Sequence, residues 1–523
     1  EAAKDPKHGD VATNLAMLLA KPLHRAPRDI AAELAAWIRD HTDGVENVEV
    51  AGPGFCNVTF SQVFWRRVVQ QVEKEGAAFG SSTIGGGRKT LVEYVSANPT
   101  GPLHVGHGRG AAAGDSLARI LRRAGYDVTT EYYINDAGRQ MRILGMSVWY
   151  RLRNLVGRTM AEPEDYYRGS YITDIAKEML EKDPSLADAS DEDGKERCYE
   201  YAKNEILEGI KKDLRDFRVE HQNWFSEKTL VDGGLVDKAF QALKDAGYTY
   251  EKDGALWFAT SRLGDDKDRV LRKSDGSLTY FASDIAYHHN KFERGFDWLI
   301  DVWGADHHGY VPRMRAAIEA MGKGKKNFDV VLIQLVNLLI NGQPVSMSTR
   351  AGTFETLADV VREVGADAAR FMFLSRKTDS PVDFDLEAVK QRTMENPVYY
   401  VQYAHARVAA LLRRAAEEGV TIPDVSDDAA LAGLTLPDDM ALLRKMALYR
   451  DMLEQAATTL SVHHVSHYLM ELSQLLHSYY TKNQILKAGD PVTTGSRLAL
   501  LRAVSRVIAN GLDLMGVSAP DHM

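Results

Sequence analysis

A chain of 523 residues is too long for one compact core, so its length predicts roughly two to four domains and excludes a small binding module. Hydrophobic residues at 45% and charged residues at 26% are ordinary proportions for a globular protein and exclude disorder as the main state. The net charge of −9 disfavours a nucleic-acid partner on average, although lysine and arginine cluster locally.

The apolar stretches are too short to cross a membrane. The longest, residues 330–340, falls well below the about 20 residues that a bilayer requires. Only two cysteines occur, Cys56 and Cys198, and they form no CxxC pattern, so neither a disulfide framework nor a cysteine zinc site is predicted. This usage fits a reducing compartment, and we expect a cytoplasmic protein. The chain starts at Glu1 without the layout of a secretory signal, so we expect a trimmed N-terminus.

The first part of the chain predicts a small α+β domain over residues 1–85. Apolar residues recur at helical spacing over residues 14–38, which predicts two helices. Residues 48–60 alternate as strands do around a Gly-Pro-Gly turn, and residues 64–72 return to a helical pattern. Residues 76–89 carry five glycines and two serines, a composition typical of a linker.

The middle of the chain predicts a Rossmann-like catalytic domain over residues 86–374. A short apolar strand, a glycine-containing loop, a helix and a second strand follow one another from residue 91 to residue 134, which is how a doubly wound parallel sheet begins. Residues 298–302 and 330–335 resemble further buried strands. The polar stretch over residues 151–253 is interpreted as an insertion at one edge of the sheet. From residue 375 to 523 the pattern is helical, so we expect a separate all-α domain there.

The segment from Leu103 to Gly110 allows two interpretations. Gly106, Gly108 and Ala111 fit the G-x-G-x-x-A pattern of a dinucleotide fold, but ten residues and two prolines separate them from the strand. The second interpretation starts from His104 and His107, which are three residues apart at the beginning of a helix. That end of a helix favours an anion, and imidazole N–H groups there can donate to a phosphate whose charge grows during reaction. The histidine pair therefore favours nucleotide chemistry.

These residues resemble the class I aminoacyl-tRNA synthetases, whose H-x-G-H motif is His104-Val-Gly-His107 here. The surrounding segment from Ser96 to Arg109 and the later Tyr133-Ile-Asn-Asp-Ala-Gly-Arg-Gln140 are similar to the arginyl-tRNA synthetases in particular. The similarity extends to residues 9–14, to Asp367-Ala-Ala-Arg370 and to residues 396–415. It therefore covers nearly the whole chain, and the last residues, 517–523, resemble a complete family C-terminus.

The resemblance implies an activity and its partners. It implies a ligase that activates L-arginine with ATP and passes the arginyl group to the 2′-hydroxyl of the terminal adenosine of tRNA(Arg) in protein synthesis. ATP with Mg²⁺ is expected as a substrate complex, with no tightly bound metal or organic cofactor. A monomer is expected. The three regions would correspond to the family's added N-terminal domain, its catalytic domain and its anticodon-binding domain.

Candidate arginine ligands follow from the chemistry of the guanidinium group. This group is planar and permanently charged, so a selective pocket needs carboxylates at fixed positions beside a planar or hydroxyl partner. Tyr280 and Asp284, four residues apart, would share one face of a helical turn, and they match the family positions that hold the guanidinium. The resemblance adds Glu93, Ser96 and Asn98 as further polar ligands of the substrate. Asp306 is a candidate because it lies at the end of another predicted strand, where doubly wound sheets bind ligands.

The second motif of the class, K-M-S-K-S, corresponds here to residues 346–350. Ser346 stands where the first lysine is expected, and Thr349 stands where the second is expected, so both lysines are missing. We predict that Arg350 supplies the missing cation as a catalytic residue. The motif residues Met347, Ser348 and Thr349, together with Gly106 and Gly108, are predicted to bind ATP.

The predicted contacts to tRNA come from two segments. The spacing of Asn57, Phe60 and Gln62 matches the family's contacts to a base in the D-loop. An exposed aromatic ring flanked by amides also suits a splayed nucleotide. An ordinary strand with a buried Phe60 explains the same pattern. Tyr403 and Arg407 lie in a helical segment and could stack on anticodon bases, although aromatic residues at helical spacing also form cores.

Metal binding and two rival functions remain. Adjacent histidines, such as His307 and His308, point in different directions and lack a third spaced ligand, so no metal site is predicted. An NAD-dependent oxidoreductase that uses Gly106, Gly108 and Ala111 is one alternative. A synthetase-derived RNA-binding protein without catalysis is the other. Exchange of pyrophosphate into ATP in the presence of arginine would separate these possibilities.

Overall fold

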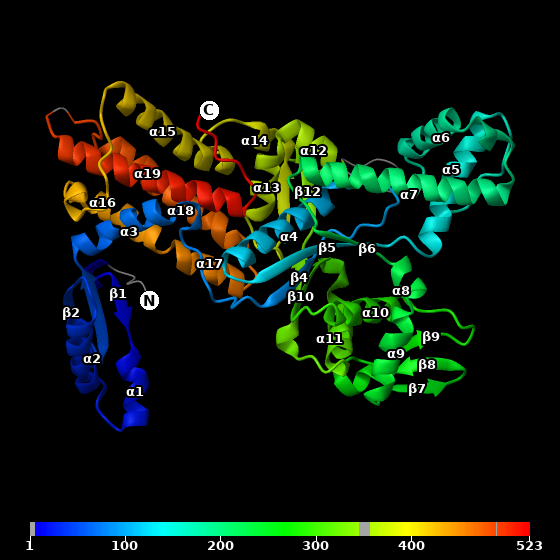
Figure 1. Cartoon of the computed structure of the whole chain (residues 1–523), viewed down its shortest axis with the longest axis horizontal. Helices are drawn as coiled ribbons and strands as arrows, with labels where there is room; N and C mark the ends of the chain where they lie inside the picture. The colour runs from blue at the N-terminus through cyan, green and yellow to red at the C-terminus, as the bar shows by residue number, and fades with distance from the viewer. Residues whose placement is uncertain (1–5, 345–355, 488) are drawn as a thin grey trace.

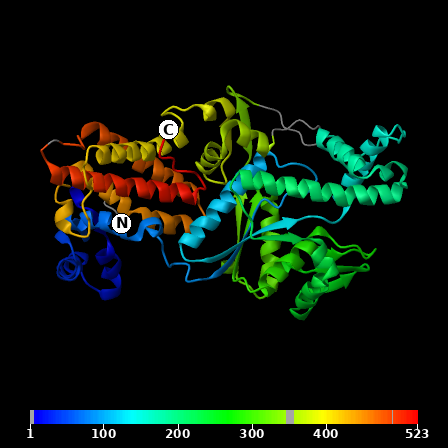
Figure 2. The same cartoon turned by 45° about the horizontal axis from the view of Figure 1, so that its top comes forward.

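The structure is a computed structural model that describes residues 6–344, 356–487 and 489–523. A twisted parallel sheet lies in the middle of the molecule, a helical bundle lies on one side of it, and a helical arm projects from the other (Figure 1). The small N-terminal unit lies next to the bundle, and a turned view shows it apart from the catalytic part (Figure 2). None of the helices in the described ranges is long and apolar enough to cross a membrane.

The central sheet has five parallel strands in the order β11-β10-β4-β5-β6. This arrangement confirms the predicted doubly wound parallel sheet. The strands are β4 (Lys89–Glu93), β5 (Asp127–Ile134), β6 (Asn223–Ser226), β10 (Trp298–Gly304) and β11 (Phe328–Ile333).

Alternating residues of these strands face two different helical layers. Val92 and Ile300 belong to the core that includes α4 (Val105–Arg123). Leu91 and Leu299 belong to a second core with α10 (Tyr280–Glu293) and α11 (Val311–Ala320). Because side chains alternate along a strand, the two layers cover opposite faces of the sheet.

The N-terminal unit has its own small core. Its antiparallel sheet has the order β1-β3-β2, with β1 (Val11–Thr13), β2 (Val45–Ala51) and β3 (Phe55–Phe60). Helices α1 (Leu15–Leu23) and α2 (Pro27–His41) cover it. Helix α3 (Gln62–Glu75) behaves differently, because Trp65 and Val69 are buried in the large core that also contains the helical bundle.

The region of the predicted insertion, together with the residues just before it, forms both an arm and part of the sheet. The arm consists of α5 (Arg139–Leu155), α6 (Ser170–Lys182) and α7 (Asp191–Asp216). The chain then returns as edge strand β6, which the sequence pattern did not predict. Two helices follow, α8 (Lys228–Asp232) and α9 (Leu235–Asp245). After them, β7 (Thr249–Lys252), β8 (Ala255–Phe258) and β9 (Arg269–Arg272) form a second small sheet.

The region from residue 375 onward, which the sequence predicted to be helical, contains a short strand near its start. Strand β14 (Val382–Asp385) pairs in parallel with β12 (Val336–Ile340), which also pairs with β13 (Gln343–Pro344). Four residues are too few for alternation to distinguish a strand from a helical turn. The remaining helices are α12 (Leu357–Val364), α13 (Ala366–Leu374), α14 (Leu386–Lys390), α15 (Pro397–Glu417), α16 (Pro437–Ala447), α17 (Tyr449–Thr458), α18 (His463–Lys482) and α19 (Pro491–Leu514).

A buried arginine joins the bundle to the catalytic part. The Arg370 guanidinium donates to the Asp115 carboxylate at 2.5 Å, to the Met515 carbonyl at 2.7 Å and to the Phe217 carbonyl at 3.1 Å. These partners lie on α4, just after α19 and just after α7. Nearby, Asp367 accepts a hydrogen bond from the Ser518 backbone at 2.9 Å. One side chain thus holds three segments that are distant in sequence.

Candidate active site

His104 and His107 cap the helix that follows β4. His104 is the N-cap of α4, and its Nδ1 accepts a hydrogen bond from the Gly106 backbone at 3.1 Å. The Nδ1 atom of His107 accepts from the His104 backbone N–H at 3.2 Å. The rings stack with their centroids 3.7 Å apart. Two of the unpaired N–H groups at the start of the helix are therefore satisfied by the two imidazoles.

This pattern fixes the charge and the tautomer of both rings. Burial lowers the pKa of His104, and burial together with the neighbouring His104 lowers the pKa of His107 to about 3. Both rings are therefore neutral at pH 7. Because each Nδ1 accepts, each Nε2 carries the remaining proton. The site presents two Nε2–H donors at the N-terminus of α4.

The two glycines of the motif have packing reasons of their own. A Cβ atom at Gly106 would come within 2.9 Å of the His104 ring, and one at Gly108 would come within 2.7 Å of Leu357 on α12. Glycine therefore lets the histidines stack and lets α12 approach α4. Their predicted contact with ATP stays a prediction.

Glu93 lies at the end of β4 among buried partners. Its side chain accepts from Ser96 Oγ at 2.9 Å and from Lys291 Nζ at 2.5 Å. Only 8% of Glu93 is exposed. Burial raises the pKa of this carboxyl, and the Lys291 charge opposes that rise. Lys291 was not among the predicted site residues.

The loop after β4 has an unusual backbone. Val95 and Ser96 have φ values of 69° and 42°, in the left-handed region that β-branched residues rarely adopt. This turn lets Ser96 Oγ donate to Glu93 and also accept from the Tyr133 backbone at 3.1 Å. Further along the loop, Asn98 donates to the Gln140 side chain at 2.7 Å. The two segments that carried the family resemblance are therefore joined here.

Asp284 and Tyr280 share one face of α10, as their spacing predicted. Asp284 is half-buried, and its carboxylate accepts a short hydrogen bond from the Tyr310 hydroxyl. Burial raises the pKa of Asp284, and the bond from Tyr310 opposes that rise. Tyr280 lies at the start of the helix and is 73% exposed. Asp306 is also exposed, and its carboxylate lies 3.5 Å from Nε2 of His307.

Carboxylates gather around the Tyr133 side chain. Burial raises the pKa of the Tyr133 phenol, and so do the negative charges of Glu227, Asp284, Glu93 and Asp136. Four acidic groups around one half-buried ring create a negative environment. A cationic ligand fits this environment, and a free anion does not.

Residues 345–355 are not described by the structure. The predicted Met347, Ser348, Thr349 and Arg350 therefore lie outside the described residues, as does Ser346. The first residues after this gap contact the histidine motif. Thr356 pairs with His104 as an isolated β-bridge, and the Leu357 backbone donates to the Leu103 carbonyl at 2.8 Å. The described chain therefore resumes beside the first histidine.

Arg109, two residues after the histidine motif, forms hydrogen bonds to two neighbouring segments of the chain. Its guanidinium donates to the carbonyls of Gln334 and Lys377, both at 2.8 Å. The side chain is fully buried, and burial lowers its pKa to about 10. Arg109 therefore ties α4 to the ends of β11 and α13 by charge-assisted hydrogen bonds.

The predicted D-loop contacts occupy different environments. Asn57 is 7% exposed within β3, and Phe60 is half-buried and stacks on Phe64 at a centroid distance of 4.3 Å. Gln62 is exposed and accepts from Arg66 at 3.2 Å. Of the three side chains, only Gln62 is fully available at the surface of the free protein.

Tyr403 and Arg407 lie on α15, where they form an aromatic and cationic group with α18. Tyr403 stacks with Tyr399 at 5.9 Å and with His477 at 5.8 Å. The Arg407 guanidinium lies 3.8 Å above the Tyr480 ring. These side chains are half-buried and so keep exposed surface. A nucleobase can stack on such a group.

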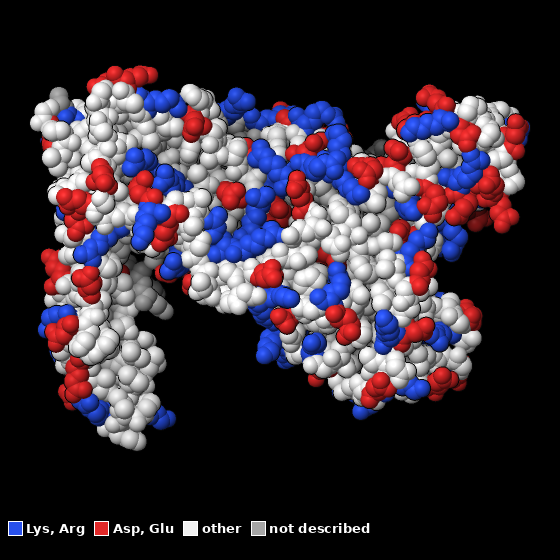
Figure 3. All heavy atoms as spheres, viewed as in Figure 1, with Lys and Arg blue, Asp and Glu red and all other residues white. Residues whose placement is uncertain are grey.

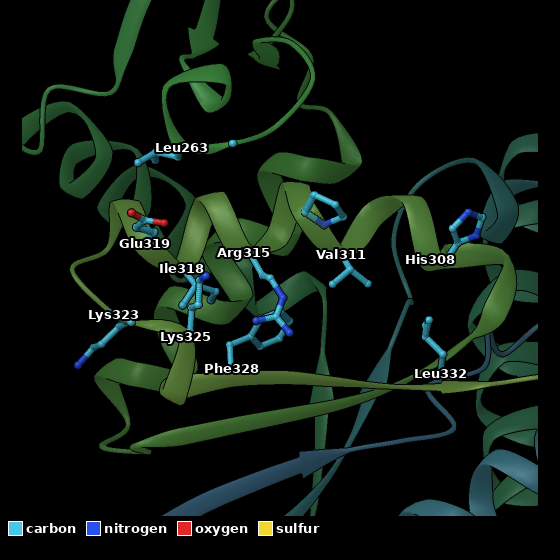
Figure 4. A pocket seen from close by; sticks show the side chains of 13 residues that line it. Leu263, His308, Val311, Arg315, Ile318, Glu319, Lys323, Lys325, Phe328 and Leu332 are labelled. Atoms are coloured by element: carbon cyan, nitrogen blue, oxygen red, sulfur yellow. The ribbon is translucent and has the colours of Figure 1, made fainter. Parts of the chain in front are cut away.

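A separate cavity lies away from these residues. It has a volume of about 470 Å³ and lies between α11 and β11, where Arg315 and Phe328 point into it (Figure 4). None of the predicted arginine or ATP ligands lines it. Within the described ranges, no group of three His, Cys, Asp or Glu side chains is arranged to hold a metal ion.

Comparison with known proteins identifies the family. Residues 1–60 match the arginyl tRNA synthetase N terminal domain, residues 69–411 match the catalytic domain of the class I (R) tRNA synthetases, and residues 401–523 match the DALR anticodon binding domain. The chain belongs to the arginyl-tRNA synthetases. It is 67% identical to the arginine–tRNA ligase of Desulfovibrio desulfuricans over all of this chain and 95% of that protein. The ligase of Lawsonia intracellularis is 53% identical over the same shares.

Solved structures agree with this membership. This synthetase resembles the putative arginyl-tRNA synthetase of Campylobacter jejuni with a TM-score of 0.81 and 36% identity, over 89% of this chain and all of that one. It also resembles the arginyl-tRNA synthetase of Thermus thermophilus with a TM-score of 0.74 over 100% of this chain and 96% of that one. At 24% identity, the second likeness shows the fold alone.

The geometry also shows which site residues the sequence missed. The arginyl-tRNA synthetase motifs predicted the histidine pair, but Lys291, Asp301 and Tyr310 carry no recognisable motif. A signal existed for two of them: Lys291 is seven residues from Asp284, which places both on one side of a helix, and Asp301 lies within a predicted buried strand. A charged residue in a buried strand requires a partner.

Proposed function

We propose the following roles for side chains in this arginine–tRNA ligase, which activates L-arginine with ATP and transfers it to tRNA. The observation that carries the proposal is the pair of neutral imidazoles at the N-terminus of α4, together with the carboxylates that surround Tyr133. An anionic triphosphate suits the helix terminus, and a cationic amino acid suits the carboxylates. The two substrates of the reaction therefore have distinct, adjacent environments.

Activation is an in-line displacement at phosphorus. A carboxylate oxygen of arginine attacks the α-phosphorus of ATP, the bond to the bridging oxygen breaks, and pyrophosphate leaves with the electron pair. The Nε2–H groups of His104 and His107 donate to the α-phosphate oxygens as their negative charge grows. Because the rings are already fixed by their Nδ1 bonds, this stabilisation needs little reorganisation. Positioning supplies much of the remaining rate.

Arginine recognition is assigned to residues from α10 and from the loop after β4. Asp284 pairs with the guanidinium while Tyr310 fixes its carboxylate, and Tyr280 covers the group from the exposed end of the helix. Glu93, Ser96 and Asn98 hold the remaining polar groups of the substrate. Asp306 is assigned to the rim of the arginine site, because its side chain is exposed in the free protein.

The leaving pyrophosphate requires cations. Arg350 is proposed as one of them, and Mg²⁺ that arrives with ATP is proposed as the other. Met347, Ser348 and Thr349, with the backbone at Gly106 and Gly108, are proposed to contact ATP. The position of Thr356 beside His104 supports this assignment, because Thr356 follows Arg350 by only six residues in the sequence.

The tRNA is assigned to two surfaces. Tyr403 and Arg407 on α15 are proposed for the anticodon, and Asn57, Phe60 and Gln62 for the D-loop. Lysine and arginine gather near the middle of one face of the molecule, whereas acidic side chains are prominent on the arm (Figure 3). An uneven distribution allows a chain of net charge −9 to bind a polyanion locally.

We propose domain boundaries near residues 85 and 374, with the insertion over residues 151–253. A monomer in the cytoplasm remains our prediction. The test of the function is arginine-dependent exchange of pyrophosphate into ATP, measured with saturating tRNA, and the charging of tRNA(Arg). Exchange without charging would favour a defect in the tRNA surfaces. No exchange together with firm tRNA binding would favour an RNA-binding protein without catalysis, and binding of NAD would favour the oxidoreductase.

A further inference from the structure

Three carboxylates lie in one row across the central sheet. Glu93 is in register with Glu131 on β5 and with Asp301 on β10. Residues in register on neighbouring parallel strands point to the same face, about 5 Å apart. All three are less than 10% exposed. Such a row is unstable unless cations compensate it.

Helix α10 supplies these cations from one side. Lys291 Nζ lies 2.5 Å from Glu93 Oε2 and 3.0 Å from Asp301 Oδ1, and the lysine is fully buried. The Arg294 guanidinium makes two bonds to Glu131, one of them at 2.8 Å. Lys291 is therefore the only described cation within ion-pair distance of Glu93.

His288 is the third partner of the row on this side. Its Nδ1 contacts the Asp284 carbonyl at 2.7 Å, and its Nε2 contacts the Asp301 carboxylate at 2.7 Å. Burial alone would raise the pKa of Asp301, but Lys291 and His288 bring it down to about 2. Asp301 is therefore ionised and accepts hydrogen bonds from Lys291 and from His288. Lys291, Arg294 and His288 thus face the three carboxylates.

The network connects directly to the substrate side. Glu93 Oε2 is occupied by Lys291, whereas Oε1 receives only the Ser96 hydroxyl. A carboxylate has about four acceptor positions, so Glu93 keeps capacity for a substrate N–H group. The same helix carries Asp284 and Tyr280 about two and three turns before Lys291. The residues that compensate the row and the residues assigned to arginine are therefore parts of one helix.

We propose that Lys291 is a positioning residue for arginine recognition, which compensates the Glu93 carboxylate and fixes its free oxygen toward the loop of Ser96. The proposal rests on the assignment of Glu93 to the substrate. Lys291 itself is too deeply buried to contact arginine, so it acts only through Glu93. Its positive charge also prevents a substrate cation from entering the space between Glu93 and Asp301.

The first test replaces Lys291 by methionine, which keeps the length of the side chain and removes its charge. In Lys291→Met we expect the KM for arginine to rise by about 10- to 100-fold, while the KM for ATP stays within about threefold of wild type. Lys291→Arg should restore part of the affinity. Lys244→Met, at an exposed lysine on α9, is the matched control and should change neither constant.

The pH profile separates this role from a merely structural one. Without Lys291, Glu93 faces Asp301 and Glu131 from the neighbouring strands, and Tyr287, His288 and Arg294 from α10. The pKa of Glu93 should then rise further, so kcat/KM for arginine should increase with pH between 6 and 9 in Lys291→Met more steeply than in wild type. A parallel profile would overturn the proposal.

A double-mutant cycle distinguishes this inference from the assignment beneath it. If Lys291 acts through Glu93, Glu93→Gln and Glu93→Gln/Lys291→Met should have arginine KM values within about threefold of each other. Losses that multiply would overturn the proposal, as would an arginine KM in Lys291→Met within threefold of wild type. A normal arginine KM in Glu93→Gln would instead overturn the assignment of Glu93. If Lys291→Met does not fold, as judged by circular dichroism, Lys291→Gln and Lys291→Arg replace it in the same cycle.

Discussion

The His104 backbone N–H donates to Nδ1 of His107 at 3.2 Å, and the two rings stack at 3.7 Å. The second histidine thus holds the first, and both Nε2–H groups are directed away from the helix. Pairs of this kind lose little freedom when the phosphate charge develops, because their orientation is fixed by backbone groups. The two histidines should therefore act as a unit.

Replacing either histidine should lower the rate without unfolding the protein. We expect His104→Ala and His107→Ala each to reduce adenylate formation on the order of 10²-fold, since each removes a donor aimed at the transition state. The double variant should lose much less than the product of the single losses. Pyrophosphate exchange with saturating arginine and tRNA measures this. Rates within threefold of wild type for both single variants would contradict the assignment.

Acid should destabilise the fold through His107. In the unfolded chain this histidine titrates near pH 6.5, whereas its folded pKa is about 3. The neutral ring therefore stabilises the fold above pH 6.5, and that contribution is lost as the pH falls from 6.5 toward 3. The loss approaches about 1.4 kcal/mol per pH unit for one proton. His107→Asn, whose amide oxygen can still accept from His104, should show a smaller fall in Tm between pH 7 and pH 4.5. His24→Asn, at an exposed position, should behave as wild type.

The pair formed by Asp284 and Tyr310 should control arginine affinity. Asp284→Asn should raise the KM for arginine on the order of 10²-fold and weaken the rejection of citrulline, because a neutral amide no longer compensates the guanidinium. Tyr310→Phe should raise it by roughly 3- to 10-fold. Tyr250→Phe removes a comparable bond to the distant Asp268 and serves as the control. Steady-state charging at varied arginine decides the question, and an unchanged KM in Asp284→Asn would shift recognition to Glu93 or Asp306.

Arg109 should contribute more to the stability of the fold than an exposed arginine does. Arg109→Met leaves the carbonyls of Gln334 and Lys377 without their donor, so we expect a loss of about 2–5 kcal/mol. Arg362→Met removes an exposed pair with Asp359 and should cost below about 1 kcal/mol. Thermal unfolding of both variants gives the comparison. Equal shifts in Tm would show that the buried bonds contribute nothing extra.

Arg407 should affect tRNA and not the small substrates. Its guanidinium lies over Tyr480, so Arg407→Ala removes both a charge and a stacking plane. We expect the KM for tRNA to rise roughly 5- to 20-fold, with the KM values for ATP and arginine unchanged. Arg414→Ala, on the same helix and paired with Glu418, is the control. A normal tRNA KM in Arg407→Ala would make this cluster part of the bundle core only.

The sequence predicted those parts of the site that depend on short, local patterns. The capping histidines and the spacing of Tyr280 and Asp284 are such patterns, because a helix translates spacing directly into direction. Lys291 meets Glu93 across 198 positions of the chain, and no local pattern encodes that contact. The same reason applies to α3, whose apolar face predicts a helix but not the bundle on which it packs. The short strand β14 was missed because its pairing partner supplies what its four residues do not.

The junction at Arg370 has a consequence for any attempt to cut this enzyme into pieces. Arg370 binds the Met515 carbonyl and Asp367 binds the Ser518 backbone, and Arg370 also binds Asp115 on α4. The residues just after the last helix therefore form part of the support of the catalytic helix. A fragment that stops near residue 374 would lose these partners and expose a buried guanidinium to an incomplete shell. Activity of an isolated catalytic fragment should thus be recovered by adding the bundle back only if its final residues are present.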